Sequence, residues 1–117
     1  MVVDGDAGRR RQVADWLRSA GFSVLLAGDG KEALASLSRT PVQLVISSIQ
    51  MPHVDGLELL RALQAVRPRP PAIMVAAGQS DIDHIYCRSA KALGAAWTAA
   101  WPIQRPDLME KVQALLA

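Results

Sequence analysis

The sequence predicts a single α/β domain, a doubly wound five-stranded parallel sheet with five helices. Short apolar runs alternate along the chain with stretches whose apolar residues recur at helical spacing. One apolar run, Val42–Ser47, has an uninterrupted hydrophobic core, which is typical of a strand buried on both faces. The 117 residues, half of them hydrophobic, are enough to bury a core. We therefore expect residues 1–117 to form one domain in which right-handed crossovers place helices on both sides of the sheet.

The first strand and helix are expected at the amino end. Met1–Val3 is a short apolar strand, and Asp6 is a suitable N-cap for a helix that runs through Ala20. The apolar face of this helix has the i, i+3, i+4, i+7 spacing and consists of Val13, Trp16, Leu17 and Ala20. Gly21 follows at the left-handed position that commonly ends a helix.

The second and third strands enclose a second helix. Phe22–Ala27 is the expected second strand, and Val42–Ser47 is the third. Between them, Asp29 is followed three residues later by Glu32, a spacing typical of a capping box at the start of a helix. The expected buried face of this helix consists of Ala33, Leu34 and Leu37.

The third helix and fourth strand are separated by prolines. A helix over Leu57–Val66 is expected to end there, because proline lacks the amide donor and restricts the residue before it. These prolines are Pro68, Pro70 and Pro71. The fourth strand is Ala72–Ala76, and the fourth helix is expected to begin at Ser80 or Asp81.

The last strand and helix complete the alternation. The fourth helix stops at Gly94, Ala95–Ala100 is the fifth strand, and Pro106 suits the first position of the last helix. The apolar face of that helix consists of Leu108, Val112, Leu115 and Leu116. In doubly wound sheets the functional crevice lies at the carboxyl ends of the strands. The loops expected to converge there cover residues 4–6, 48–56, 76–80 and 101–102.

The most informative stretch follows the third strand, over residues 48–56. It contains Met51 and Pro52 and ends with Asp55 and Gly56 before an amphipathic helix. A strand followed by such an x-Met-Pro-x-x-Asp-Gly loop resembles the active-site loop of bacterial response-regulator receiver domains. The resemblance covers nearly the whole chain and implies a flavodoxin/CheY-like sheet with strand order 2-1-3-4-5. It also implies a signal-transduction module of the two-component, or phosphorelay, type.

The residues that carry the chemistry of that family are mostly replaced. In receivers, an aspartate at the position of Ser48 accepts a phosphoryl group from a histidine kinase. The remaining crevice positions of the family correspond to Asp4, Gly5, Ala76, Trp101 and Pro102, and the switch aromatic corresponds to Thr98. Asp4 is a vestige of the metal site, so we expect no cofactor and weak or absent Mg²⁺ binding. The resemblance is therefore to a degenerate pseudo-receiver that lacks the phosphoacceptor aspartate.

Structural roles are expected for the residues at the altered positions. Ser48 is expected to be a small polar residue bonded to neighbouring amides, because no base matches a nearby position to activate its hydroxyl. The Trp101 ring is expected to fill the vacated site, with its N–H bonded to a carbonyl oxygen. Asp6 is expected to cap its helix rather than hold a metal.

A further expectation concerns protein partners. In receivers, the fourth helix, fifth strand and fifth helix often form the docking or dimerisation face, which here contains Ile82, Ile85, Tyr86 and Trp97. Trp97 is a plausible anchor for a partner, and core packing is an equally good interpretation. Charged residues of this stretch, Asp83 among them, are expected to be mostly solvated. The resemblance implies a histidine kinase or a fused effector domain as partner, and a homodimer through the last two helices.

These observations predict a cytoplasmic protein-interaction module of signal transduction that is not an enzyme. The single Cys87 cannot form an internal disulfide, and no apolar run approaches the roughly 20 residues needed to span a membrane. The alternative is a regulatory domain that binds a small molecule in the vacated crevice. A third hypothesis, nucleic-acid binding through Arg9–Arg11, is weakly supported because the net charge is only +2 and this is the one basic cluster.

Overall fold

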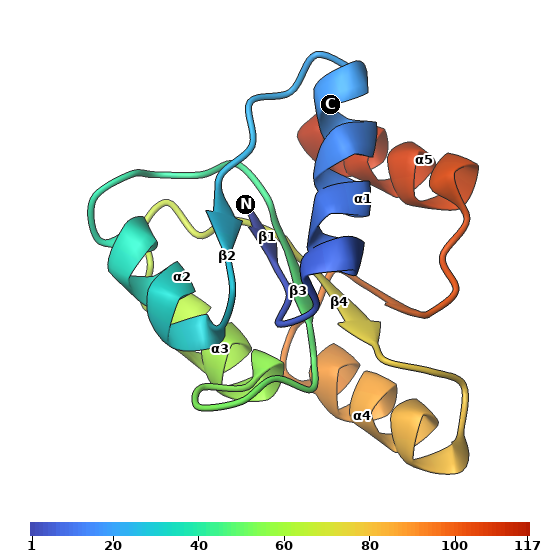
Figure 1. The fold of residues 1–117 in the computed structure, drawn as a ribbon. Helices are drawn as coiled ribbons and strands as arrows, with labels where there is room; N and C mark the ends of the chain where they lie inside the picture. The colour runs from blue at the N-terminus through green and yellow to red at the C-terminus, as the bar shows by residue number, and fades with distance from the viewer.

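The computed structural model describes all 117 residues and contains five strands that alternate with five helices (Figure 1). In chain order they are β1 Val2–Val3, α1 Ala7–Ser19, β2 Leu26–Ala27, α2 Gly30–Leu37, β3 Val45–Ser48, α3 Gly56–Leu63, β4 Ala72–Ala76, α4 Asp81–Ala92, β5 Trp97–Ala100 and α5 Arg105–Leu116. All neighbouring strands are parallel, which confirms the predicted α/β class. None of the helices combines the length and the hydrophobicity that crossing a bilayer requires.

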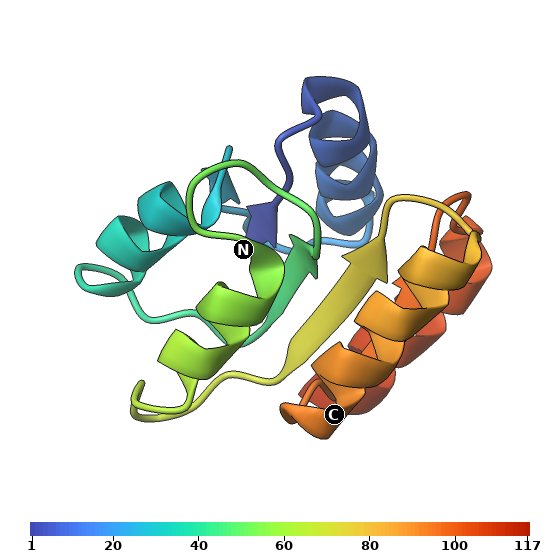
Figure 2. The ribbon, with the colours of Figure 1, turned by 90° about the horizontal axis from the view of Figure 1, so that it is seen from below.

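The strands pair in the order β2-β1-β3-β4-β5, as the resemblance implied. β1 lies between β2 and β3, with Val3 opposite both Ala27 and Ser47. β3 and β4 are neighbours in the middle of the sheet and run in the same direction (Figure 2). From β1 the chain first adds β2 on one side and then β3 on the other, so the strand order reverses between β1 and β3, and the loops after these two strands open at the same edge.

Two layers of helices cover the sheet. α1 and α5 pack on one face around Leu17, Leu108 and Val112, whereas α2, α3 and α4 cover the other face around Leu59 and Leu63. The ribbon separates the two layers, with α1 beside α5 and α2 beside α3 (Figure 1). All residues of β3 are buried because both faces are covered, as predicted.

Several elements are shorter than predicted, because the neighbouring strand is short or because the helical hydrogen bonds give way to a turn. The expected second strand, Phe22–Ala27, is paired only at its last two residues, since β1 offers only two residues as partners. At the end of α3, the amides of residues 64–66 bond to carbonyl groups three residues back, which tightens the chain into a turn. The other corrected starts are Val45 for β3, Trp97 for β5 and Arg105 for α5, which makes Pro106 the second helical residue.

The helix ends follow the predicted caps, with one correction. Asp6 accepts the amide three residues on at 2.9 Å, which confirms it as the N-cap of α1, and Gly21 after this helix has a φ of +93°. Asp29 accepts the amide of Glu32 at 2.8 Å, as predicted. The Glu32 carboxylate, however, accepts the amide of Gly28 at 3.1 Å, so the capping box at this helix is incomplete.

Candidate functional site

The carboxyl ends of the strands gather the residues that the sequence assigned to the crevice. Asp4 directly follows β1, and Ser48 ends β3, its neighbour in the sheet. Ala76 ends β4, and Trp101 follows β5, which pairs with β4. The residues at this edge are Asp4, Gly5, Ser48, Ala76, Trp101 and Pro102.

Asp4 is buried, and an arginine of α1 balances its charge. Arg9 Nε lies 3.4 Å from Asp4 Oδ2, and Arg9 Nη2 donates to Asp4 Oδ1 at 3.4 Å. The amide of Asp6 also donates to Asp4 Oδ1, at 2.9 Å, and Arg10 Nη1 donates to the carbonyl oxygen of Asp4 at 2.7 Å. The carboxylate of the crevice is therefore already paired with a cation that the chain itself supplies.

Trp101 contacts the same cation with its ring. The ring centroid lies 5.8 Å from Arg9 Cζ, within the range of a cation–π contact. The expectation that a carbonyl oxygen accepts the indole N–H is wrong, because Trp101 Nε1 is buried without a hydrogen-bond partner. The guanidinium of Arg9 thus lies next to both the carboxylate of Asp4 and the indole of Trp101. Sequence reasoning missed this role of Arg9, which it treated only as part of a basic cluster.

The residues of the crevice do not fit Mg²⁺. This ion requires several oxygen ligands in near-octahedral geometry, and here the one carboxylate is paired with a guanidinium. Asp6, the next acid along the chain, uses its carboxylate to cap α1, and the hydrogen bond from the Arg9 amide lowers the pKa of Asp6. Nowhere in the chain do three His, Cys, Asp or Glu side chains come together in a way that could hold a metal ion.

Ser48 makes its hydrogen bond within its own loop. The residue is 4% exposed, and its hydroxyl donates to the carbonyl oxygen of Gln50 at 3.1 Å, whereas neighbouring amides were the expected partners. Ala76 is fully buried and brings no hydroxyl to the site; its carbonyl oxygen accepts the amide of Trp101 at 3.0 Å. Neither position therefore presents a free polar group to a bound phosphoryl group.

The loop between β3 and α3 is held by close packing at Gly56. A Cβ atom at this position would lie 2.7 Å from Ile49 Cα and would collide with the carbonyl oxygen of Ser48, so only glycine fits. The amide of Gly56 donates to the carbonyl oxygen of Ile49 at 2.8 Å, and Asp55 caps α3. At Gly5, by contrast, a Cβ atom would make ordinary contacts at 3.6 Å. Close packing therefore requires glycine at position 56, whereas position 5 has room for a larger side chain.

Gln50 and Asp83 connect this loop to α4, a contact that sequence reasoning missed. Gln50 Nε2 donates to Asp83 Oδ1 at 2.7 Å, and Gln50 Oε1 accepts the amide of Ala77 at 3.0 Å. The hydroxyl of Ser80 and then the amide of Gln50 lower the pKa of Asp83. Asp83 is only 7% exposed, so it is the exception to the expectation that the charged residues of this stretch are mostly solvated. The Ser-x-x-Asp spacing of a capping box was the available signal for Asp83; Gln50 carries none.

The expected interaction face is only partly open to solvent. Ile82 and Ile85 of α4 are 59% and 51% exposed. Tyr86 and Trp97 are half-buried, and a lysine ammonium of α5 lies 5.8 Å from the centre of the Trp97 ring. Thr98, opposite Met74 in β4, is also half-buried. The two isoleucines are therefore the members of this face that a partner can reach most directly.

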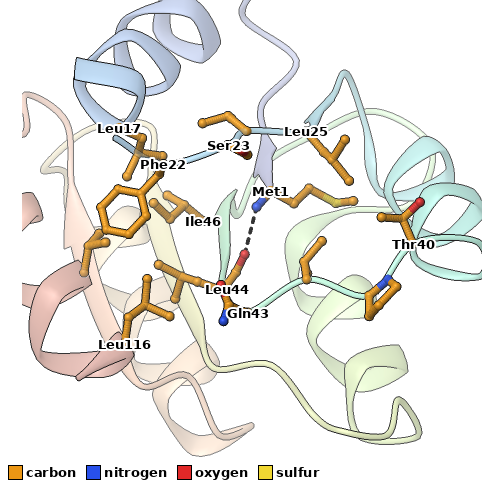
Figure 3. Close-up of a pocket in the computed structure, with 14 residues that line it drawn as sticks. Met1, Leu17, Phe22, Ser23, Leu25, Thr40, Gln43, Leu44, Ile46 and Leu116 are labelled. Carbon is orange, nitrogen blue, oxygen red and sulfur yellow. Dashed lines mark hydrogen bonds between the residues drawn. The ribbon is translucent and has the colours of Figure 1, made fainter. Parts of the chain in front are cut away.

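The two hollows of the structure are not formed by the polar residues of the crevice. The larger one has a volume of about 380 Å³, and its lining of fourteen residues carries no charged side chain (Figure 3). The Met1 ammonium in it donates to the carbonyl oxygen of Leu44 at 2.8 Å, and burial lowers the pKa of this ammonium to about 6. The second hollow, about 260 Å³, lies between β5 and α5. Neither is lined by Asp4, Ser48 or Trp101, and the one crevice residue that contributes to a hollow is Pro102, which lines the second.

Comparison with known protein families matches residues 1–113 to the response regulator receiver domain. The chain belongs to this family. It is 36% identical to protein-glutamate methylesterase/protein-glutamine glutaminase 2 of Caulobacter vibrioides over 98% of the chain and 36% of that protein. It is 38% identical to the transcriptional regulatory protein GlrR of Escherichia coli over 73% of the chain and 19% of that protein. This receiver domain therefore spans less than half the length of either relative.

Solved receiver structures share the fold over almost the whole chain. The receiver domain of NtrX from Brucella abortus superposes with a TM-score of 0.89 at 28% identity, covering 98% of this chain and 95% of that one. A CheY-like receiver domain from Methanospirillum hungatei gives a TM-score of 0.84 at 28% identity, covering 98% of this chain and 90% of that one. The flavodoxin/CheY-like architecture is thereby confirmed, and the chain is a receiver domain of the two-component type.

Proposed function

We propose that this receiver domain is a degenerate pseudo-receiver, which is not phosphorylated and acts by docking protein partners without catalysing a reaction. The observation that carries the proposal is the ion pair between Asp4 and Arg9, with the Trp101 ring next to the guanidinium. A divalent ion at Asp4 would meet the positive charge of Arg9 at close range and would have to displace it. Arg9 thus supplies, from the chain itself, positive charge at the carboxylate that a metal ion would need.

The groups that would accept and stabilise a phosphoryl group are also missing from the crevice. A serine hydroxyl is a weak nucleophile without an adjacent base, and that of Ser48 donates to a carbonyl oxygen of its own loop. Ala76 offers no hydroxyl, and the indole of Trp101 cannot supply the ammonium that would balance phosphoryl oxygens. These substitutions all weaken the same chemistry, which supports a signalling role that does not depend on it.

The docking role is supported by the exposed face of α4. Ile82 and Ile85 are three residues apart on one helix, so their side chains form a single apolar surface. We propose a histidine kinase or a fused effector domain as the partner, with a homodimer through α4 and α5 as a second mode of contact. The relatives named as a transcriptional regulator and a methylesterase are longer than this chain, which supports a fused effector.

A phosphoryl analogue tests the first part of the proposal. Mg²⁺ with beryllofluoride is expected to leave the tryptophan fluorescence unchanged, because Trp101 packs against Arg9 beside the crevice and reports any binding there. Acetyl phosphate with Mg²⁺ is expected to leave the intact mass unchanged. A receiver domain that carries the phosphoacceptor aspartate serves as the positive control. A saturable Mg²⁺-dependent signal from this chain would refute the proposal.

A pair of surface substitutions tests the docking face. The double variant Ile82→Ser, Ile85→Ser is expected to abolish partner binding or self-association measured by sedimentation velocity, since it removes the exposed apolar surface of α4. The matched control is Leu25→Ser, Leu26→Ser, which changes two leucines that are 40% and 39% exposed at β2. Equal loss of association in both variants would show that α4 is not the docking face.

Neither alternative function gains a supporting observation. A small-molecule site in the crevice would need a cavity lined by its polar residues, and neither hollow is lined by Asp4, Ser48 or Trp101. For nucleic acid, the basic cluster is mostly engaged inside the domain: Arg9 pairs with Asp4, and Arg10 donates to the main chain of Asp4. Only Arg11 of this cluster is exposed.

A further inference from the structure

Gln50 bridges the loop after β3 and the loop after β4. Its carboxamide oxygen accepts the amide of Ala77 at 3.0 Å, and its carboxamide nitrogen donates to Asp83 Oδ1 at 2.7 Å. The main-chain carbonyl oxygen of Gln50 accepts the hydroxyl of Ser48 at 3.1 Å. Hydrogen bonds therefore lead from Ser48, at the position of the family's phosphoacceptor, through Gln50 to the first turn of α4.

Asp83 holds that first turn in place. The hydroxyl and the amide of Ser80 donate to its carboxylate, and Ser80 Oγ accepts the amide of Asp83 at 3.4 Å, which completes a capping box. No cation balances this buried carboxylate, since the one ion pair of the structure joins Arg9 and Asp4. A buried carboxylate without a cation is tolerated only while its hydrogen bonds persist, so the donation from Gln50 matters for the position of Asp83.

The same turn carries the exposed isoleucines. Ile82 precedes Asp83, and Ile85 follows it by two residues, while Asp83 itself is buried. Side chains on a helix keep fixed angles to one another around its axis. A shift of Asp83 would therefore turn or displace both isoleucines relative to the sheet.

We propose that Gln50 is a positioning residue, a hydrogen-bonded latch that fixes the orientation of α4 and couples its exposed face to the crevice. The inference rests on the proposed function, because it names how the docking face is regulated. While the carboxamide bridges Ala77 and Asp83, residues 77–83 hold one conformation without a phosphoryl group. A partner that displaces Gln50, or a change at Ser48 that moves its main chain, releases this segment.

Hydrogen exchange in the full chain measures the latch directly. Gln50→Met keeps the length of the side chain and removes both polar ends, so the amides of residues 77–85 are expected to exchange about tenfold faster. The pKa of Asp83 is expected to rise toward its ordinary value in the same variant, because it loses the donation from Gln50. Gln113→Met, at an exposed position of α5, serves as the control and is expected to change neither quantity.

The pKa of Asp83 reports selectively on the hydrogen bond from Gln50, because few groups shift this pKa. The groups that lower its pKa are Ser80, Gln50 and the amide of Gly78, and no charged side chain is among them. The titratable group that senses its charge is the thiol of Cys87, one turn further along α4. A purely structural disturbance at position 50 would speed exchange without a selective shift at Asp83.

Exchanging the donor and the acceptor between positions 50 and 83 distinguishes a hydrogen-bonded latch from simple packing. Q50E sets two carboxylates against each other, and D83N sets two amide donors against each other, so each single variant is expected to speed exchange. The double variant Q50E/D83N restores the hydrogen bond with donor and acceptor exchanged, and is expected to return exchange to within about threefold of the parent rate. A double variant as fast as the faster single variant would overturn the latch, as would Q50M indistinguishable from Q113M.

These measurements separate the latch from the proposed function. They use the free chain, without partner or phosphoryl analogue. Binding of beryllofluoride would refute the pseudo-receiver proposal and leave a positive latch result standing. Unchanged exchange in Q50M would overturn the latch and leave the crevice chemistry as it is.

Discussion

Asp4 and Asp83 are buried to the same degree near the carboxyl ends of the strands, at 6% and 7% exposure, yet the chain satisfies them differently. Asp4 lies against the guanidinium of Arg9, which also contacts the ring of Trp101. Asp83 has no cation and accepts hydrogen bonds from Gln50 and Ser80. The carboxylate of Asp4 is balanced by a positive charge, and that of Asp83 by hydrogen bonds from neutral donors.

The two carboxylates therefore differ in what is needed to disturb them. Removing the cation from Asp4 would leave an uncompensated charge in a buried place, so this contact resists exchange with solvent ions. The hydrogen bonds at Asp83 come from a side chain of one loop and a cap residue of another, and each can rearrange without separating charges. In the proposed function Asp4 closes the crevice to metal ions, and in the proposed latch Asp83 is the regulated position.

The largest effect is expected from removing the cation at Asp4. Arg9→Met should lower the free energy of unfolding by about 2 kcal/mol, less than for a fully buried pair because the Arg9 side chain is 29% exposed. Urea denaturation measures the change. Arg11→Met, which alters an exposed arginine of the same helix, should change the free energy of unfolding by less than about 0.5 kcal/mol.

The partner of Arg9 can be verified in the same experiment. Asp4→Asn added to Arg9→Met removes the stranded charge, and the double variant should recover part of the lost free energy of unfolding. If the double variant is no more stable than Arg9→Met alone, the loss does not come from Asp4, and the contrast with Asp83 disappears.

A smaller effect is expected in acid, at Asp83. Hydrogen bonds from Ser80 and Gln50 lower the pKa of Asp83 below its ordinary value of 3.8. The stabilisation from the ionised carboxylate is therefore present above that value and is lost as the pH falls through the lower pKa of the folded state. Urea denaturation between about pH 5 and about pH 2 should show this loss, and Asp83→Asn should remove it. Asp15→Asn, at an exposed acid of α1, should leave the acid dependence in place.

The smallest effect is expected at Cys87. Burial raises the pKa of this thiol, and the negative charge of Asp83 raises it further. Asp83→Asn should therefore increase the thiolate fraction and speed alkylation by iodoacetamide at about pH 8, by roughly twofold. Asp4→Asn should not, because Arg9 balances the charge of Asp4. Equal rates in both variants would mean that Asp83 does not act on the thiol through its charge.

Spacing along the chain was sufficient to predict the architecture, and the resemblance to receivers selected the residues that lie at one edge of the sheet. The alternation of apolar runs and helical periods predicted the five strands and five helices, and the loop that ends at Gly56 indicated the family. Ala76 was located correctly at the end of β4, whereas Ser48, expected to begin the loop after the third strand, is the last residue of β3. Strand lengths were less predictable: residues 22–25 fall outside β2 because β1, a distant segment, offers only two residues for pairing.

The residue types of the chain by themselves determined which chemical groups the crevice lacks: an acid at position 48, a hydroxyl at position 76 and an ammonium at position 101. What took their place was decided only by the tertiary structure. The contact of Arg9 with Trp101 depends on how α1 packs beside the end of β5, and the bond from Gln50 to Asp83 joins residues 33 positions apart. Neither contact has a local pattern, because it arises only when separate loops meet at one edge of the sheet.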